Sequence, residues 1–278
     1  MKNEKAYGVF EQAKVPQSAL DNALEALVCR GFAVLEHALP AADVADLNAR
    51  LEAVYAKQCD EVGGEDNLMA LGDADIVRLP LAYDRAFLDL ALHPAITEAA
   101  RRLIGPNVVL MMQNGVINRP ERTQAQTAWH RDLNYQHWVS SRPLAISAMI
   151  CLEDFTEETG GTIFLAGSHK VEAMPSEALL TAAGETPRAG AGSIVLFDSM
   201  VFHRTGINRS SRVRRGINHV IATPIMGQVI DTPRMLERML GTSAPSDPFV
   251  AGYLGYRWNP VENVTEWRRR KLAAIRRA

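Results

Sequence analysis

Apolar residues recur at helical spacing through the first third of the chain. Three segments place apolar side chains three and four residues apart, the spacing of one helix face: 18–31, 41–56 and 85–103. Ser18 and Gly31 stand where a helix cap and a helix end are expected. Pro94 predicts an interruption of the third segment, and a short strand is expected at 32–36. This part of the chain is therefore predicted to be mainly helical.

After Pro106 the pattern changes to short apolar runs separated by turns that are rich in glycine and polar residues. The runs that we expect to form strands are 108–112, 144–152, 162–165, 193–197 and 216–223. Short strands in this arrangement are typical of a β-sandwich or jelly roll. The chain is therefore predicted to be mainly β with flanking helices, the N-terminal helices packing outside the jelly roll.

No stretch with the composition of a linker divides the 278 residues, so one domain over 1–278 is expected. Its predicted parts are a helix-rich region over about 1–105, a jelly-roll core over about 106–225, and a C-terminal lid or helix over about 226–278.

Composition narrows the functional classes. The formal net charge of -2 gives no basic surface of the kind that nucleic-acid binding requires. No apolar run reaches the length of a membrane span, and the charged first residues lack the apolar stretch of a secretory signal. Three cysteines, odd in number and widely spaced, are expected to remain reduced thiols. We therefore expect a cytoplasmic protein that binds neither nucleic acid nor membrane.

The segment Trp129-His130-Arg131-Asp132 carries the most informative chemistry. On a strand, His130 and Asp132 point to the same side, and the residue between them faces outward. A second histidine, His203, follows far downstream before another apolar run. Two histidines and one carboxylate form the facial triad of non-haem iron enzymes, which leaves positions open for cosubstrate and oxygen.

An arginine after the second histidine adds a further role. Arg214 follows a turn at Gly206-Ile207-Asn208, so a return strand would carry it beside the metal. A guanidinium group matches the distal carboxylate of a dicarboxylic cosubstrate such as 2-oxoglutarate. Arg215 would face the opposite side of that strand, and Arg209 and Arg212 are expected in the turn.

In combination these residues resemble a known family. The ordered set is Trp129 to Asp132, then Glu158-Thr159-Gly160-Gly161 through Gly167-Ser168-His169-Lys170, then Gly192 to His203, and on through Asn208 and Ser210 to Arg214. Over about residues 30–225 the chain resembles the phytanoyl-CoA dioxygenase superfamily. The resemblance implies a double-stranded β-helix, an Fe(II) cofactor, and 2-oxoglutarate and O2 as cosubstrates.

The same resemblance implies roles for individual residues. His130, Asp132 and His203 would bind iron, and Arg214 would anchor the carboxylate of 2-oxoglutarate with help from Thr205. Gln113 and Asn118 match positions that line the cosubstrate pocket. They lie on opposite faces of a regular strand, so both could serve only if a bulge intervened. His169, in the Gly-Ser-His-Lys element, is expected to be architectural.

For the substrate, no basic cluster suited to an acyl-CoA is present near the site. The regions around Asp132 and His203 resemble bacterial members that act on saccharides, including orthosomycin-type oxygenases of oligosaccharide and aminoglycoside antibiotics. The side chains that would contact a sugar by stacking or hydrogen bonding are Asn134, Tyr135, Gln136, Trp138 and Arg142, although ordinary loop packing explains them equally well. Segment 253–259, with Arg257, could close over the site as a lid.

The predicted activity is therefore oxidation of a C–H bond in a small molecule, by hydroxylation or oxidative cyclisation, in a monomer or homodimer. Asp132 disfavours halogenation, which needs a small residue in its place. A zinc hydrolase with the same three ligands is a rival enzyme class, but its reaction would leave Arg214 without a role. The alternative outside catalysis is an inactive jelly-roll protein that binds sugar or acts as a sensor and keeps a vestigial metal site.

Overall fold

The computed structural model describes residues 15–276 except 121, 123–124, 134 and 259. The α-helices are α1 (Ala19–Arg30), α2 (Ala41–Glu61), α3 (Glu65–Leu71), α4 (Arg85–Ala91), α5 (Pro94–Leu103), α6 (Glu177–Ala183), α7 (Thr232–Leu240), α8 (Pro248–Tyr253) and α9 (Val264–Ile275). The strands are β1 (Phe32–Leu35), β2 (Ile76–Arg78), β3 (Val109–Asn118), β4 (Ala145–Cys151), β5 (Thr162–Leu165), β6 (Gly184–Glu185), β7 (Ile194–Asp198), β8 (His203–Thr205) and β9 (Arg214–Ala222).

Two antiparallel sheets form the core. The main sheet has the strand order β1-β7-β4-β9-β3-β2, and the smaller sheet has the order β6-β5-β8. The predicted mainly β fold with flanking helices is confirmed, and the five predicted strands correspond to β3, β4, β5, β7 and β9. β1 and β2, from the helix-rich part of the chain, form the two edges of the main sheet.

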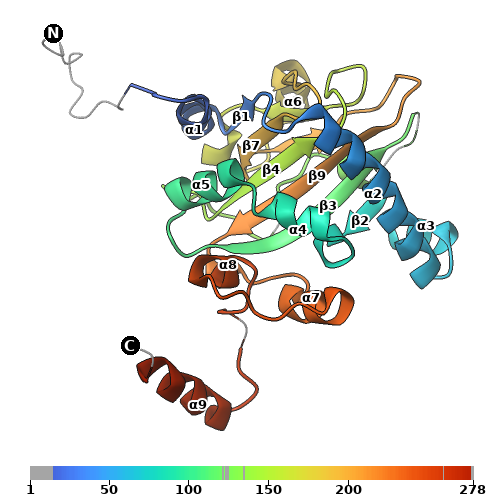
Figure 1. The fold of residues 1–278 in the computed structure, drawn as a ribbon. Helices are drawn as coiled ribbons and strands as arrows, with labels where there is room; N and C mark the ends of the chain where they lie inside the picture. Colours follow the sequence, from blue (N-terminus) through green and yellow to red (C-terminus); the bar gives the residue numbers. More distant parts are fainter. Residues whose placement is uncertain (1–14, 121, 123–124, 134, 259, 277–278) are drawn as a thin grey trace, which may run out of the picture.

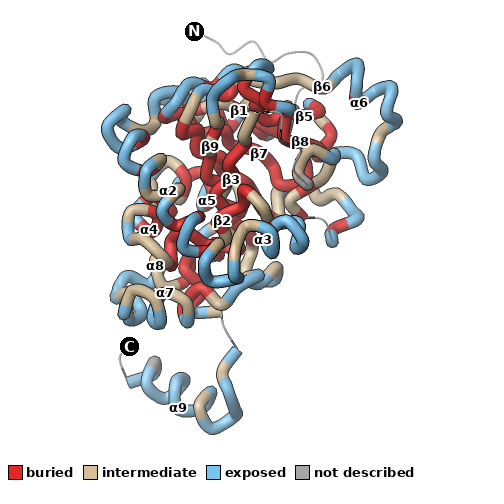
Figure 2. Tube along the Cα trace, turned by 90° about the vertical axis from the view of Figure 1, so that its right-hand side faces the viewer, coloured by how far each residue is buried: buried red, intermediate tan, exposed pale blue. Residues whose placement is uncertain are grey.

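Helices α1, α2, α4 and α5 pack on one face of the main sheet (Figure 1). A large apolar cluster joins this face to the helices, with Leu24, Leu51 and Ile96 from helices and Ile146 and Ile217 from strands. Figure 2 shows that the buried segments follow the sheets and the inner helix faces, whereas α9 projects away and is mostly exposed. A second apolar cluster, which includes Phe164 of β5 and Phe197 of β7, fills the space between the two sheets.

The N-terminal helices form for the local reasons that the sequence indicates. Ser18 caps α1 by accepting a hydrogen bond from the backbone N–H of Asp21, and Gly31 ends it in a left-handed conformation with φ of 91°. The third helical segment divides into α4 and α5, and Pro94 is the first residue of α5. In the described part of the chain, no helix combines the length and apolar character that a membrane crossing requires.

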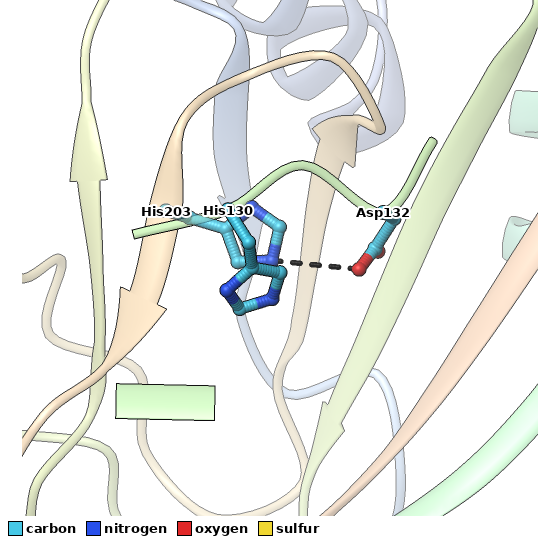
Figure 3. Close-up of side chains that lie close together, drawn as sticks. All are labelled: His130, Asp132 and His203. Atoms are coloured by element: carbon cyan, nitrogen blue, oxygen red, sulfur yellow. Dashed lines mark ion pairs between the residues drawn. The ribbon is translucent and has the colours of Figure 1, made fainter. Parts of the chain in front are cut away.

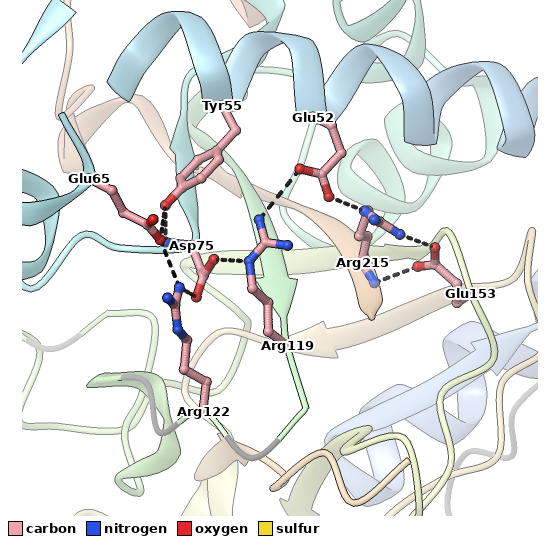
Figure 4. Close-up of polar contacts among 8 residues, drawn as sticks. All are labelled: Glu52, Tyr55, Glu65, Asp75, Arg119, Arg122, Glu153 and Arg215. Carbon is pink, nitrogen blue, oxygen red and sulfur yellow. Dashed lines mark hydrogen bonds and ion pairs between the residues drawn. The ribbon is translucent and has the colours of Figure 1, made fainter. Parts of the chain in front are cut away.

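A network of ion pairs ties α2 and α3 to one end of the main sheet (Figure 4). Asp75, only 1% exposed at its side chain, binds Arg119 Nε at 2.7 Å and Arg122 Nη1 at 2.8 Å. Glu52 of α2 contacts both Arg119 and Arg215. Because these charges come from elements far apart in sequence, the network fixes where β9 begins relative to the helices.

Candidate metal and cosubstrate site

The side chains of His130, Asp132 and His203 converge between the two sheets (Figure 3). One ligand atom from each lies within 4.8 Å of the others. The imidazole rings of the two histidines are 4.3 Å apart at their centroids, and Nε2 of His203 lies 3.5 Å from Oδ1 of Asp132. The structure therefore brings together the three residues that the sequence predicted as iron ligands.

Backbone pairing holds the two ligand segments side by side. His130 and His203 exchange two backbone hydrogen bonds, of 2.9 and 3.0 Å, and the N–H of Asp132 donates to the carbonyl oxygen of Ser199. The prediction that both His130 and Asp132 lie on a strand is wrong, because only His130 makes a β-bridge. After Asp132 the backbone N–H of Gln136 bonds to the carbonyl of Leu133 and not to the His203 segment.

Both histidines are oriented with Nε2 toward the centre of the triad. Nδ1 of His130 lies 2.8 Å from the carbonyl oxygen of Ala128, and Nδ1 of His203 lies 3.0 Å from that of Val201. A carbonyl oxygen accepts only, so Nδ1 carries the proton and Nε2 is left with a free lone pair. Burial, followed by the nearby His203, lowers the pKa of His130, which favours the neutral, metal-binding form.

Asp132 is held through its other oxygen. Ser147 of β4 donates a 2.5 Å hydrogen bond to Oδ2, and Nδ2 of Asn218 on β9 donates a second at 3.2 Å. Ser199 in turn lies 2.8 Å from the Ser147 hydroxyl. Burial alone would raise the pKa of Asp132, but the two histidines, when protonated, and the Ser147 hydrogen bond hold it well below its usual range. Asp132 is thus ionised, with Oδ1 facing the histidines.

Sequence reasoning did not identify these supporting residues. The polar Ser147 stands inside the apolar run that became β4, where a buried hydroxyl needs a partner. That single polar residue was the available signal. Arg131 was predicted to face outward, and this is wrong. It is buried, donates to the carbonyls of Met200 and Glu172, and lies 3.8 Å from the centroid of the Phe202 ring.

Arg214 begins β9, as predicted, and is 1% exposed. Its Nη2 donates to the carbonyl of Gly160, its guanidinium lies 4.3 Å from the centroid of the Phe155 ring, and its Nε has no hydrogen-bond partner among the described residues. Burial lowers the pKa of Arg214 to about 10. A buried cation without a facing carboxylate is costly, so this end of the site suits an anion.

Asn118 lies beside Arg214, because the two residues are paired across β3 and β9. Its side chain donates to the carbonyls of Gly160 and Gly206. Gly160 has φ of 71°, and an added Cβ would lie 2.6 Å from Nδ2 of Asn118, so only glycine fits this turn. Asn208 closes the loop before β9 by donating to the carbonyls of Asn118 and Arg212. The glycine-rich turn therefore accepts hydrogen bonds from both Arg214 and Asn118.

A cavity of about 200 Å³ adjoins the triad. Thr205 lines it, and so do Asn114, Asn218 and Arg78, which sequence reasoning missed. Arg214 is not among the lining residues of this cavity. It lines a separate cavity, together with Glu153 and Arg215.

Gln113 does not line the cavity, and its predicted role is corrected. The bulge in β3 falls between Leu110 and Met112, ahead of Gln113, so pairing from Gln113 to Asn118 is regular and the two residues face opposite sides. Gln113 faces the helices, where its side chain accepts from the N–H of Leu81 and donates to the carbonyl of Phe87.

The residues predicted to contact substrate are not gathered at the cavity. Tyr135 and Trp138 are 86% and 56% exposed, and Arg257 is exposed with its guanidinium 4.8 Å from the centroid of the Trp258 ring. Gln136 is buried and bonds to the backbone of Trp138 within its own loop, Arg142 is exposed, and Asn134 lies outside the described residues.

The predicted lid is also corrected. Tyr253 and Leu254 are buried in the cluster that joins the helices to the main sheet, and Gln228 ties this segment to β3 by donating to the carbonyls of Leu110 and Leu254. Removal of these side chains from water in the cluster favours that position.

Comparison with known proteins supports this geometry. The family model described as phytanoyl-CoA dioxygenase matches residues 27–216. An uncharacterized protein of Mycobacterium tuberculosis is 28% identical over 257 residues, which cover 90% of this chain and 92% of that protein. Dioxygenase olcK of Penicillium canescens is 27% identical over 198 residues, which cover 66% of this chain and 62% of that protein.

Solved structures show the same fold. AviO1 from Streptomyces viridochromogenes matches with a TM-score of 0.58 and 23% identity over 73% of this chain and 94% of that one. The epimerase SnoN, in complex with Fe3+, alpha ketoglutarate and nogalamycin RO, matches with a TM-score of 0.57 and 19% identity over 74% of this chain and 84% of that one. The matched family model spans most of the chain and includes all three triad residues. The chain therefore belongs to the phytanoyl-CoA dioxygenase family of iron- and 2-oxoglutarate-dependent oxygenases.

Proposed function

We propose that this protein uses Fe(II), 2-oxoglutarate and O2 to oxidise a C–H bond of a small molecule, by hydroxylation or oxidative cyclisation. The observation that carries the proposal is the triad of His130, Asp132 and His203, whose ligand atoms lie within 4.8 Å of one another. Two neutral imidazoles and one carboxylate are the ligand set that suits ferrous iron with open coordination positions. Bound there, the iron would activate oxygen for C–H oxidation.

The residues of the chain have separate tasks in this proposal. The two Nε2 atoms and Oδ1 of Asp132 hold the metal, while Ser147 and Asn218 fix the carboxylate through Oδ2. Arg214 supplies the buried cation for the distal carboxylate of 2-oxoglutarate, and Asn118 lies beside it on β3. Thr205 lines the cavity that adjoins the triad. The protein thereby binds, orients and shields the reacting groups.

The substrate that we propose is a saccharide or a sugar-containing natural product. Nogalamycin RO is the ligand in the SnoN complex, which has the same fold. The cavity beside the triad carries several uncharged hydrogen-bonding side chains, including Asn114, Asn218 and Thr205. Such a lining suits a hydroxylated small molecule better than an acyl chain.

We further propose that residues 1–278 act as one oxygenase domain, as a monomer or homodimer in the cytoplasm. The main sheet takes β1 and β2 from the N-terminal region, which supports a single folding unit. The thiols of Cys29, Cys59 and Cys151 are free, which suits a reducing compartment.

The test is an anaerobic titration with Fe(II) and 2-oxoglutarate. Chelation of the metal by the keto acid should give a weak visible charge-transfer band, and His130→Ala should abolish it. His137→Ala, which changes an exposed histidine outside the triad, is the matched control and should keep the band. A wild-type protein without the band would overturn the oxygenase proposal and favour an inactive binding protein.

A further inference from the structure

A row of polar side chains crosses the main sheet at the level of the triad. Asn218 of β9 pairs with Asn114 of β3, and Asn114 pairs with Arg78 of the edge strand β2. Directly paired residues on neighbouring strands place their side chains on the same face. All three line the cavity beside the triad. The row therefore runs from the metal site to the edge of the main sheet.

Hydrogen bonds link the two ends of this row to their surroundings. Asn218 donates to Oδ2 of Asp132 at 3.2 Å. With its amide oxygen toward Arg78, Asn114 accepts a 3.2 Å hydrogen bond from Nη1 and donates to the carbonyl of Gln113. Oδ1 of Asn218 is buried and has no partner among the described residues. The row thus contains an unsatisfied buried acceptor near the metal site and presents a guanidinium donor near the edge.

Arg78 and Arg214 differ in their counter-charges, while Arg131, which also lines the cavity, donates to backbone carbonyls. Nε and Nη2 of Arg78 bind the two carboxylate oxygens of Asp73, so its charge is compensated. Arg214 makes no ion pair with any described carboxylate, and it lies on β9 about 13 Å from Asn218 at the rise of an extended strand. An uncompensated buried cation requires an anion, whereas a compensated one can donate hydrogen bonds to neutral oxygen atoms.

We propose that Arg78, Asn114 and Asn218 form the substrate subsite and that it takes an uncharged, hydroxyl-bearing ring such as a pyranose. The inference rests on the proposed function, because the ring must lie beside the iron ligands to be oxidised. Hydroxyl groups both donate and accept, so one hydroxyl of the ring can accept from Arg78 while another bonds to an amide group of the row. A carboxylate on the ring would meet the negative charge of Asp73 and bind less well.

The experiment uses the full chain loaded with Zn(II), a diamagnetic stand-in for iron, and 2-oxoglutarate. Saturation-transfer NMR is recorded with two probes that share one ring, methyl β-D-glucopyranoside and methyl β-D-glucuronide. We expect stronger transfer to the neutral glucopyranoside. Arg78→Met should weaken its binding about tenfold, the effect of losing one hydrogen bond to a charged group. The matched control, Arg188→Met, changes an exposed arginine outside the cavity and should bind like the wild type.

Two further variants sharpen the test. Asn114→Leu leaves the pair of Arg78 and Asp73 in place and should also weaken the glucopyranoside, which keeps the proposal testable if Arg78→Met does not fold. Asp73→Asn removes the counter-charge of Arg78, so the preference should shift toward the glucuronide.

The outcomes separate the subsite from the proposed function. Saturation transfer to 2-oxoglutarate reports the cosubstrate site, and its absence in the wild type would count against the proposed function. Three results would overturn the subsite. The first is binding of 2-oxoglutarate with no transfer to either sugar, and the second is a wild-type preference for the glucuronide. The third is unchanged sugar binding in both Arg78→Met and Asn114→Leu.

Discussion

The hydroxyl of Ser147 donates a 2.5 Å hydrogen bond to Oδ2 of Asp132, while Oδ1 of the same carboxylate faces His203. This division of the two oxygens leaves one of them for a metal and keeps the other occupied. Ser147 comes from the middle of β4 and Asp132 from an irregular segment, so the sheet itself fixes the orientation of the ligand.

Removing this hydrogen bond should weaken metal binding. We expect Ser147→Ala to lower the affinity for Fe(II) about 10-fold to 100-fold, the usual effect of losing a group that orients a metal ligand. Ser147→Thr keeps the hydroxyl and should restore much of the affinity, whereas Ser211→Ala, at an exposed position, should have no effect. An anaerobic Fe(II) titration measures all three, and equal affinity in Ser147→Ala and the wild type would contradict the role.

Arg214 should matter for the cosubstrate and not for the metal. Truncating one partner of a buried charge pair costs about 2 kcal/mol or more, so Arg214→Met should weaken 2-oxoglutarate binding about 30-fold or more. Without the cosubstrate the same variant should be at least as stable as the wild type, because it removes a buried cation that makes no direct ion pair with a described carboxylate. Calorimetric titration and thermal unfolding with and without 2-oxoglutarate check both statements, and tight binding by Arg214→Met would refute the anchor.

His219 should make stability depend on pH. It is fully buried against Gln113, and burial lowers its pKa to about 3. The unfolded chain, with an ordinary histidine pKa near 6.5, binds the proton more tightly, so stability is complete above that value and is lost as pH falls toward 3.

His219→Gln should flatten this pH dependence, and His137→Gln, at an exposed position, should leave it unchanged. Chemical denaturation across pH 4 to 7.5 is the measurement. An unaltered profile for His219→Gln would show that other groups cause the loss of stability.

The network around Asp75 should contribute to stability more than an exposed ion pair does. Asp75→Asn leaves Arg119 and Arg122 without their shared carboxylate, and asparagine tolerates the positive φ of 63° at this position. Because both arginines are partly exposed, we expect a loss of about 2 kcal/mol in the free energy of unfolding, below the cost for a fully buried pair. Asp66→Asn, at an exposed position of α3, is the comparison, and similar denaturation midpoints for the two variants would contradict the prediction.

The sequence by itself determined the elements and the chemistry of the centre. The cap at Ser18, the end at Gly31 and the break at Pro94 act within one turn of chain, so local pattern was enough to predict these helices. The triad was predictable because iron needs particular ligand types, and those residues must be present whatever surrounds them.

The tertiary structure decided which side chains support the site and which do not. Gln113 and its neighbour Asn114 are both amide side chains, but they lie on opposite faces of β3. Strand pairing, and the face that the helices cover, decide which of them reaches the cavity. Ser147 of β4 meets Asp132, which lies in an irregular segment 15 residues earlier in the chain. Tyr253, at the end of α8, is buried in the apolar cluster between the helices and the main sheet and does not close the cavity. These outcomes depend on long-range register and on competition for apolar surface, which no local pattern encodes.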